Sequence, residues 1–181
     1  MKKLKFVYFL LFALVVTFAN AKTETMNVTD SDVAWTTIDK ALAQTKSDNK
    51  KFILVDLYTD WCGWCKKMDE NTFTEQSVVS LLNTNFTAVK FNAETQSSVL
   101  FNGKTYNSAK TGARGANQLA LDLGSVGGKL GYPTLVVLDA NGTKLQAFPG
   151  FKDVETMSAI LKFYQSGSYK SMDFQQFQSG Q

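Results

Sequence analysis

The chain has 181 residues, of which 44% are hydrophobic and 13% aromatic; this is enough apolar surface for one packed domain and too much for a disordered chain. Its formal charge is +3, but three of its 19 basic residues lie in the first 21 positions, which contain no acid. The remaining 16 basic residues are balanced by 16 acidic ones. A neutral domain gives no support to nucleic-acid binding through a basic surface.

The first 21 residues have the pattern of a secretory signal peptide. Three lysines precede an apolar run over 6–16, and small residues at Ala19 and Ala21 fit a cleavage site before Lys22. The run is shorter than the roughly 20 residues that span a bilayer. We therefore expect residues 1–21 to be removed and the mature protein to be exported to the periplasm or cell envelope, with no stable membrane anchor after cleavage. An uncleaved anchor is the alternative.

Hydrophobic periodicity divides the rest of the chain into helices and strands. The stretch "KFILVDLY" is apolar almost throughout and has the length of a strand, which is typical of a strand buried on both faces. Asn-Gly pairs beginning at Asn102 and Asn141 predict tight hairpin turns. In chain order, the predicted elements are a helix over 33–46, a strand over 51–58, a helix from about Cys62 that restarts near Thr74, a strand over 86–92, a hairpin over 99–106, a short helix over 116–124, a hairpin over 134–148 and a helix over 153–164.

This order of elements predicts an α/β fold. A strand–helix–strand unit with a right-handed crossover gives a parallel pair of strands, and the later hairpin adds antiparallel strands to the same sheet. We expect a central mixed sheet with helices on both faces, forming one domain over 22–165. Residues 166–181 are predicted to form a polar and aromatic tail that either docks on this domain or stays mobile.

Both cysteines, Cys62 and Cys65, lie in the stretch "TDWCGWCKKM". A structural zinc site needs four ligands, and the chain has two cysteines and no histidine, so a metal site is disfavoured. A structural disulfide is the second alternative, but closing so short a loop gains little, because the stabilisation grows with loop length. A Cys-x-x-Cys pair at a strand-to-helix junction favours a redox dithiol, since the start of a helix stabilises a thiolate.

Two charged residues interrupt the apolar strands. Asp56 lies within 51–58 and Lys90 within 86–92, and an isolated buried carboxylate is costly. If the two strands are neighbours, the side chains can pair, and a carboxyl group in a low-dielectric environment has a raised pKa and exchanges protons. The alternative is an edge strand with Asp56 facing solvent and Lys90 extending its charge to water.

The stretch "VDLYTDWCGWCK", followed much later by "GYPTLVV", resembles the thioredoxin superfamily, and most of all the exported thioredoxin-like thiol–disulfide interchange proteins of bacteria. The resemblance covers about 33–164. It implies a thioredoxin-like fold with an insertion, about 93–130, between the second central strand and the Pro133 loop. The site residues that it implies are Cys62 as the exposed nucleophile, Cys65 as the buried resolving cysteine, Asp56 as the acid that manages the proton of Cys65, Lys90 as the partner of that acid, Pro133 as a cis-proline that faces the sulfurs, and Trp61, Trp64 and Tyr132 as substrate-binding residues.

The residues around the cysteines bear on the direction of the reaction. Gly63-Trp64 stands between the cysteines where thioredoxins have Gly-Pro, and Glu70 lies near the place of the usual helix proline. We expect a protein-disulfide reductase, because no His or Arg lies between the cysteines to stabilise the thiolate, and a stabilised reduced form is what makes a strong oxidant. The positive charges of Lys66 and Lys67 favour the thiolate and so argue against this direction. The alternatives are a disulfide oxidase or isomerase, and a non-enzymatic binding module with a structural disulfide.

The expected partners are protein thiols and disulfides, together with a membrane reductase that supplies electrons. We expect a monomer that needs no cofactor beyond its own dithiol, holds no metal and binds no nucleic acid. The insertion is expected to lie near the site and to select partners.

Overall fold

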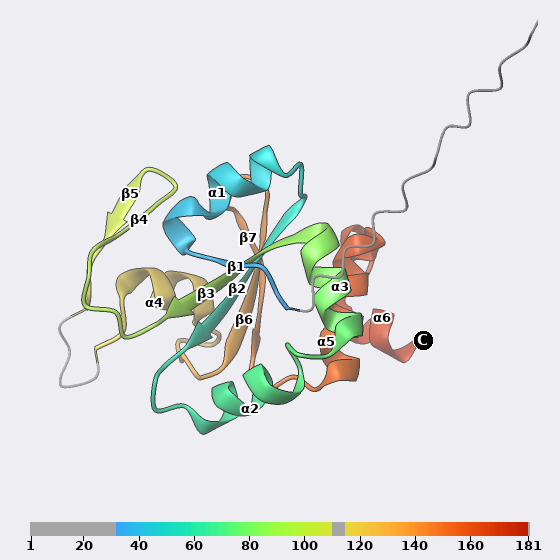
Figure 1. The fold of residues 1–181 in the computed structure, drawn as a ribbon. Helices are drawn as coiled ribbons and strands as arrows, with labels where there is room; N and C mark the ends of the chain where they lie inside the picture. The colour runs from blue at the N-terminus through green and yellow to red at the C-terminus, as the bar shows by residue number, and fades with distance from the viewer. Residues whose placement is uncertain (1–31, 110–114, 181) are drawn as a thin grey trace, which may run out of the picture.

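The computed structural model describes residues 32–109 and 115–180. The predicted signal peptide, its cleavage site before Lys22, residues 110–114 of the predicted insertion and Gln181 lie outside the described residues. A five-stranded sheet in the order β1-β3-β2-β6-β7 forms the centre of the molecule (Figure 1). Its strands are β1 (Trp35–Thr36), β2 (Phe52–Tyr58), β3 (Phe86–Asn92), β6 (Thr134–Asp139) and β7 (Lys144–Pro149).

The central strand β2 runs parallel to β3 and antiparallel to β6. β1 is parallel to β3, and β7 is antiparallel to β6. This mixed sheet confirms the predicted α/β fold class. The helices are α1 (Ile38–Ser47), α2 (Gly63–Asn71), α3 (Gln76–Asn85), α4 (Gln118–Gly124), α5 (Val154–Gln165), the 3₁₀ turn η1 (Ser168–Lys170) and α6 (Phe174–Ser179).

Each face of the sheet has its own hydrophobic core, because successive residues of a strand point to opposite faces. Phe52 and Leu54 of β2 pack in the core that also contains residues of α2, α3 and α5. Ile53 and Val55 pack in the core that contains residues of α1 and α4. Figure 1 shows these two sets of helices on opposite sides of the sheet. By the same alternation, Asp56 lies on the face that α2, α3 and α5 cover.

The helix predicted over 33–46 begins later than its periodicity indicates. Within this range, Trp35–Thr36 form β1 and pair with Ala88 and Val89 of β3. The helix α1 then begins at Ile38. Backbone pairing at the edge of the sheet therefore outweighs the helical spacing of the apolar side chains.

The segment between β3 and β6 contains a hairpin that stands apart from the main sheet, followed by α4. The strands β4 (Val99–Phe101) and β5 (Lys104–Tyr106) pair only with each other among the described strands (Figure 1). Asn102 and Gly103 at their turn have φ values of 48° and 75°, which Asn-Gly turns adopt. A Cβ atom on Gly124 would lie 2.4 Å from Leu57 Cδ1, so a larger residue at the end of α4 would require the buried Leu57 side chain to shift.

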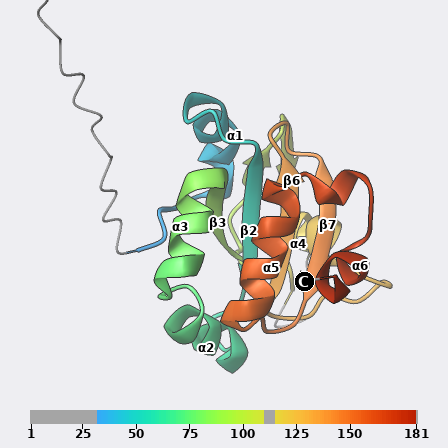
Figure 2. The same cartoon turned by 90° about the vertical axis from the view of Figure 1, so that its right-hand side faces the viewer.

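Residues 166–180 dock on the domain. The helix α6 lies beside α5 (Figure 2). The ring of Phe174 lies 5.6 Å from that of Phe163 and 5.3 Å from that of Phe148, and the ring of Phe177 lies 5.2 Å from Phe163. Of the two alternatives for the tail, the structure shows the docked one.

Candidate active site

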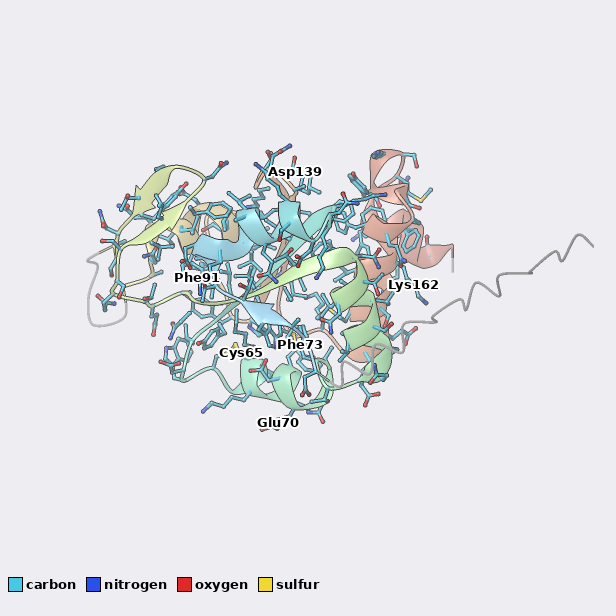
Figure 3. The ribbon with its side chains drawn as sticks, turned by 45° about the horizontal axis from the view of Figure 1, so that its top comes forward. Cys65, Glu70, Phe73, Phe91, Asp139 and Lys162 are labelled. Carbon is cyan, nitrogen blue, oxygen red and sulfur yellow. A yellow bond between two sulfur atoms is a disulfide. The ribbon has the colours of Figure 1, made fainter. Side chains whose placement is uncertain are left out.

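The two cysteines lie where β2 leads into α2. Cys62 is the N-cap of α2, and its sulfur accepts a hydrogen bond from the backbone N–H of Cys65 at 3.1 Å. The two residues form a disulfide, with their Cα atoms 5.3 Å apart. Figure 3 shows Cys65 on the side of α2 that faces the sheet and Glu70 on its far side. The Cys62 sulfur thus lies where the free N–H groups of a helix start stabilise negative charge.

Cys62 is less exposed than the resemblance implies. Its exposed fraction is 4%, and that of Cys65 is 1%, so the prediction of an exposed first cysteine is wrong for the oxidised protein. The disulfide ties the Cys62 sulfur to the buried Cys65, and the hydrogen bond from the Cys65 N–H holds this sulfur against the helix. Cys62 remains the more accessible residue of the pair.

Asp56 and Lys90 are register partners in the adjacent strands β2 and β3. They share the face of Leu54 and Ala88, which belong to the core beneath α2. Lys90 Nζ lies 2.7 Å from Asp56 Oδ2. Asp56 is fully buried, whereas the Lys90 side chain is 23% exposed. The alternative in which Asp56 faces solvent is therefore wrong, and the pairing expected for neighbouring strands is present.

Burial determines how tightly Asp56 holds a proton. Loss of hydration raises the pKa of the Asp56 carboxyl from 3.8 to about 6, and the charge and hydrogen bond of Lys90 offset only part of this effect. For Lys90, burial favours the neutral form, but the nearby carboxylates outweigh it, so the pKa of its ammonium is raised. Asp56 Oδ1 has no hydrogen-bond partner among the described residues. A carboxyl group with a pKa of about 6 accepts and releases protons near neutral pH.

Asp69 is a third member of this charge network that was not predicted from the sequence. It lies four residues after Cys65, on the same side of α2, and its Oδ1 accepts a hydrogen bond from Lys90 Nζ. Its side chain is 41% exposed. Lys90 thus links the buried carboxyl of Asp56 to a carboxylate at the surface. The spacing from Cys65 is the signal in the sequence that points to Asp69.

An exposed tryptophan directly precedes each cysteine, Trp61 at 53% and Trp64 at 57% exposure. Trp61 Nε1 donates a hydrogen bond to Glu94 Oε2 at 2.9 Å. The Trp61 ring also meets the Tyr132 ring edge to face, with the centroids 5.9 Å apart. The Trp64 ring lies 5.6 Å from that of Phe151. Large apolar side chains left in water are typical of surfaces to which other proteins bind.

The loop that carries Pro133 is tied to the loop after β7. The Tyr132–Pro133 peptide bond is cis, and the N–H of Gly150 donates to the Pro133 carbonyl at 2.7 Å. Lys152 holds the second loop in place, because its Nζ donates to the carbonyl groups of residues 148–150 at 2.6 to 3.4 Å. Lys152 was not predicted from the sequence, since a lone lysine in a loop is indistinguishable by pattern from a solvated one.

The groups with redox or proton chemistry that the structure places on α2 and beneath it are Cys62, Cys65, Asp56, Lys90 and Asp69. Within residues 32–109 and 115–180, the structure contains no cluster of three or more Cys, His, Asp or Glu side chains arranged to hold a metal. In the same part of the chain, no helix has the length and apolar character needed to cross a membrane.

A mixed five-stranded sheet, a Cys-Gly-Trp-Cys disulfide at the start of the helix after the central strand, and a cis-proline loop define a protein of thioredoxin fold. The sequence profile of the thioredoxin-like domain family matches residues 38–165. The chain therefore belongs to the thioredoxin-like domain family.

The thiol:disulfide interchange protein DsbD of Cronobacter sakazakii is 32% identical to the chain over 126 residues, which are 68% of this chain and 18% of that protein. The chain thus spans less than a fifth of the length of this curated relative. Among solved structures, a thioredoxin-fold protein from Helicobacter pylori has a TM-score of 0.53 at 19% identity, covering 73% of this chain and 80% of its own. A thioredoxin from Thermus thermophilus has a TM-score of 0.52 at 16% identity, covering 74% and 88%. These two likenesses show the fold.

Proposed function

We propose that this chain is an exported thiol–disulfide oxidoreductase that reduces protein disulfides. In the reduced protein, the thiolate of Cys62 attacks one sulfur of a substrate disulfide; that S–S bond breaks, and the other substrate sulfur leaves as a thiolate that takes up a proton. Cys65 then loses its proton to Asp56 and attacks the Cys62 sulfur, which releases the second substrate thiol. Two electrons pass to the substrate, and the Cys62–Cys65 disulfide forms.

The observation that carries this proposal is the disulfide at the start of α2, the helix whose Asp69 is linked through Lys90 to a buried Asp56 with a pKa raised to about 6 by burial. The helix start supports the thiolate on Cys62. The Asp56–Lys90–Asp69 network supports proton transfer between Cys65 and the surface. A substrate protein binds to the region around the disulfide, which includes Trp61, Trp64, Tyr132 and Pro133.

The working cycle requires a dithiol donor that returns two electrons to the oxidised pair. We propose a membrane reductase of the cell envelope for this role; the similarity to an interchange protein supports it. Export follows from the predicted signal peptide. A mature protein that begins at Lys22, identified by mass spectrometry of the cell-envelope fraction, is the expected result. The protein acts as a monomer, and residues 93–130 select its partners.

Mixed-disulfide trapping tests the enzyme. Cys65→Ser removes the resolving thiol, so substrates are expected to remain covalently bound to Cys62, whereas the matched variant Cys62→Ser captures none. Wild-type protein with added dithiol is expected to reduce a model protein disulfide, and Cys62→Ser is expected to lose this activity. Full activity of Cys62→Ser would end the proposal.

The reduction potential separates the reductase from its alternatives. A value near about −270 mV supports reduction, whereas about −120 to −180 mV is typical of oxidases and isomerases. The low exposure of Cys62, 4%, is the observation that favours a binding module with a structural disulfide. That alternative requires a potential below about −300 mV and partner binding that survives the loss of both sulfurs.

A further inference from the structure

Trp64, Lys67 and Phe151 form one cluster beside the disulfide. Trp64 lies between the two cysteines and is 57% exposed. Its ring centroid lies 5.6 Å from that of Phe151, with the ring planes at 50°. Lys67 follows three residues later in α2, a spacing that brings two side chains together on one side of a helix. The cluster therefore joins α2 to the loop after β7.

The Lys67 ammonium is held over both rings. Its Nζ lies 5.1 Å from the centroid of Trp64 and 5.9 Å from that of Phe151, within the range of cation–π attraction. Among the residues that the structure describes, the ion pairs involve Lys90 and Lys104, so Lys67 has no carboxylate partner there. A positive charge is thus held over the ring of Trp64, the residue that precedes Cys65, with no ion-pair partner among the described residues.

The Trp61 side of the cysteines has the opposite charge. Glu94 accepts a hydrogen bond from Trp61 Nε1, and Asp60 accepts one from Asn92 Nδ2 at 3.1 Å. Neither carboxylate is paired with a lysine among the ion pairs of the described residues. A bound polypeptide therefore meets a cation near Trp64 and carboxylates near Trp61.

We propose that the Trp64–Lys67–Phe151 cluster is a specificity subsite for an acidic side chain next to the reactive cysteine of a protein substrate. This inference rests on the proposed function and names the class of substrate. A Glu or Asp carboxylate pairs with an ammonium that the two rings already order, so little side-chain entropy is lost on binding. The backbone beside that residue covers the exposed face of Trp64. Complementary charge of this kind selects among partners that all contain a disulfide.

The test uses three disulfide-linked peptides of equal length that differ in the residue before the cysteine: Glu, Gln or Lys. Pre-reduced protein is mixed with each peptide in a single turnover, and the products are quantified by mass spectrometry after an acid quench. The wild-type protein is expected to react about two- to five-fold faster with the Glu peptide than with the Gln peptide, the range of an exposed ion pair. The ratio is expected to approach one in about 1 M salt, where screening acts over about 3 Å.

The neighbouring lysine supplies the matched control. Lys66→Gln removes the same charge from an exposed position of α2 that has no cation–π contact within the described residues, and it is expected to keep the wild-type ratio. Lys67→Gln is expected to lose the preference, and Lys67→Glu to favour the Lys peptide. Equal rates for all three peptides in the wild type, or an equal loss in Lys66→Gln and Lys67→Gln, would overturn the subsite alone. Failure to exchange with any peptide would overturn the proposed function together with it.

Discussion

Lys90 and Asp56 occupy matching positions in two adjacent parallel strands, and their charged atoms meet 2.7 Å apart beneath α2. The pair is unequal, because Asp56 is fully buried while the Lys90 side chain retains 23% exposure. The attraction to Lys90 therefore offsets only part of the free energy lost when the Asp56 carboxylate is removed from water. The folded protein keeps an ionisable group whose charged form is destabilised.

Asp56→Asn is expected to stabilise the oxidised protein at pH 7. Asp56 binds its proton more tightly in the folded state, with a pKa of about 6 against 3.8, so the folded state carries the extra proton between these values. The free energy of unfolding therefore falls as the pH rises through this window, by about 3 kcal/mol in total. Because asparagine does not titrate, the free energy of unfolding of the variant lacks this dependence on pH.

Urea denaturation at a series of pH values measures this effect. The wild-type protein is expected to lose stability between about pH 4 and pH 6 relative to Asp56→Asn, and the two are expected to converge below that window. Asp122→Asn, at a side chain that is 55% exposed, serves as the control and is expected to change little. Parallel curves for the wild type and Asp56→Asn would contradict the raised pKa.

The pKa of Asp56 is expected to respond in opposite directions to its two neighbours. Lys90→Met removes the cation that favours the carboxylate, so the pKa of Asp56 rises further. Asp69→Asn removes a negative charge that disfavours it, so the pKa of Asp56 falls. Carbon-13 NMR titration of the Asp56 carboxyl in the oxidised protein measures both. A shift of the Asp56 pKa in the same direction in both variants would contradict the opposite effects of Lys90 and Asp69 on this carboxyl group.

Lys152→Met is expected to destabilise the protein by about 1–3 kcal/mol, because it leaves the carbonyl groups of residues 148–150 without their donor. The methionine keeps most of the aliphatic length. Lys162→Met, at an exposed position of α5, controls for the substitution itself. Urea midpoints of the two variants give the comparison, and equal midpoints would mean that the Lys152 ammonium contributes nothing to the loop.

Phe174→Ala is expected to lower the free energy of unfolding by about 1–2 kcal/mol, the value for a side chain that is only partly buried. The lost contacts are those with Phe148 and Phe163. Gln175→Ala changes the neighbouring exposed residue of α6 and is expected to be nearly neutral. Chemical denaturation of both variants is the measurement. No difference between them would indicate that α6 adds no stability to the domain.

The sequence was most informative about the central strands and the charged residues within them. The apolar run around Asp56 predicts the central strand, and the charged interruptions at Asp56 and Lys90 anticipate their meeting across two strands. Asp69 was missed although its spacing of four residues from Cys65 places both on one side of α2, because its contact with Lys90 also depends on how α2 packs on the sheet. The burial of Cys62 was missed for a different reason, since it follows from the disulfide and the helix cap together.

Cys62 is the N-cap of α2 as well as one half of the disulfide. A disulfide sulfur is a weak acceptor for the Cys65 N–H, whereas a thiolate on the same atom accepts a stronger, charge-assisted bond. Gaining electrons therefore tightens the first turn of α2. By thermodynamic linkage, any substitution that stabilises this turn when Cys62 is a thiolate also shifts the redox equilibrium between the dithiol and the disulfide, although both cysteines are unchanged.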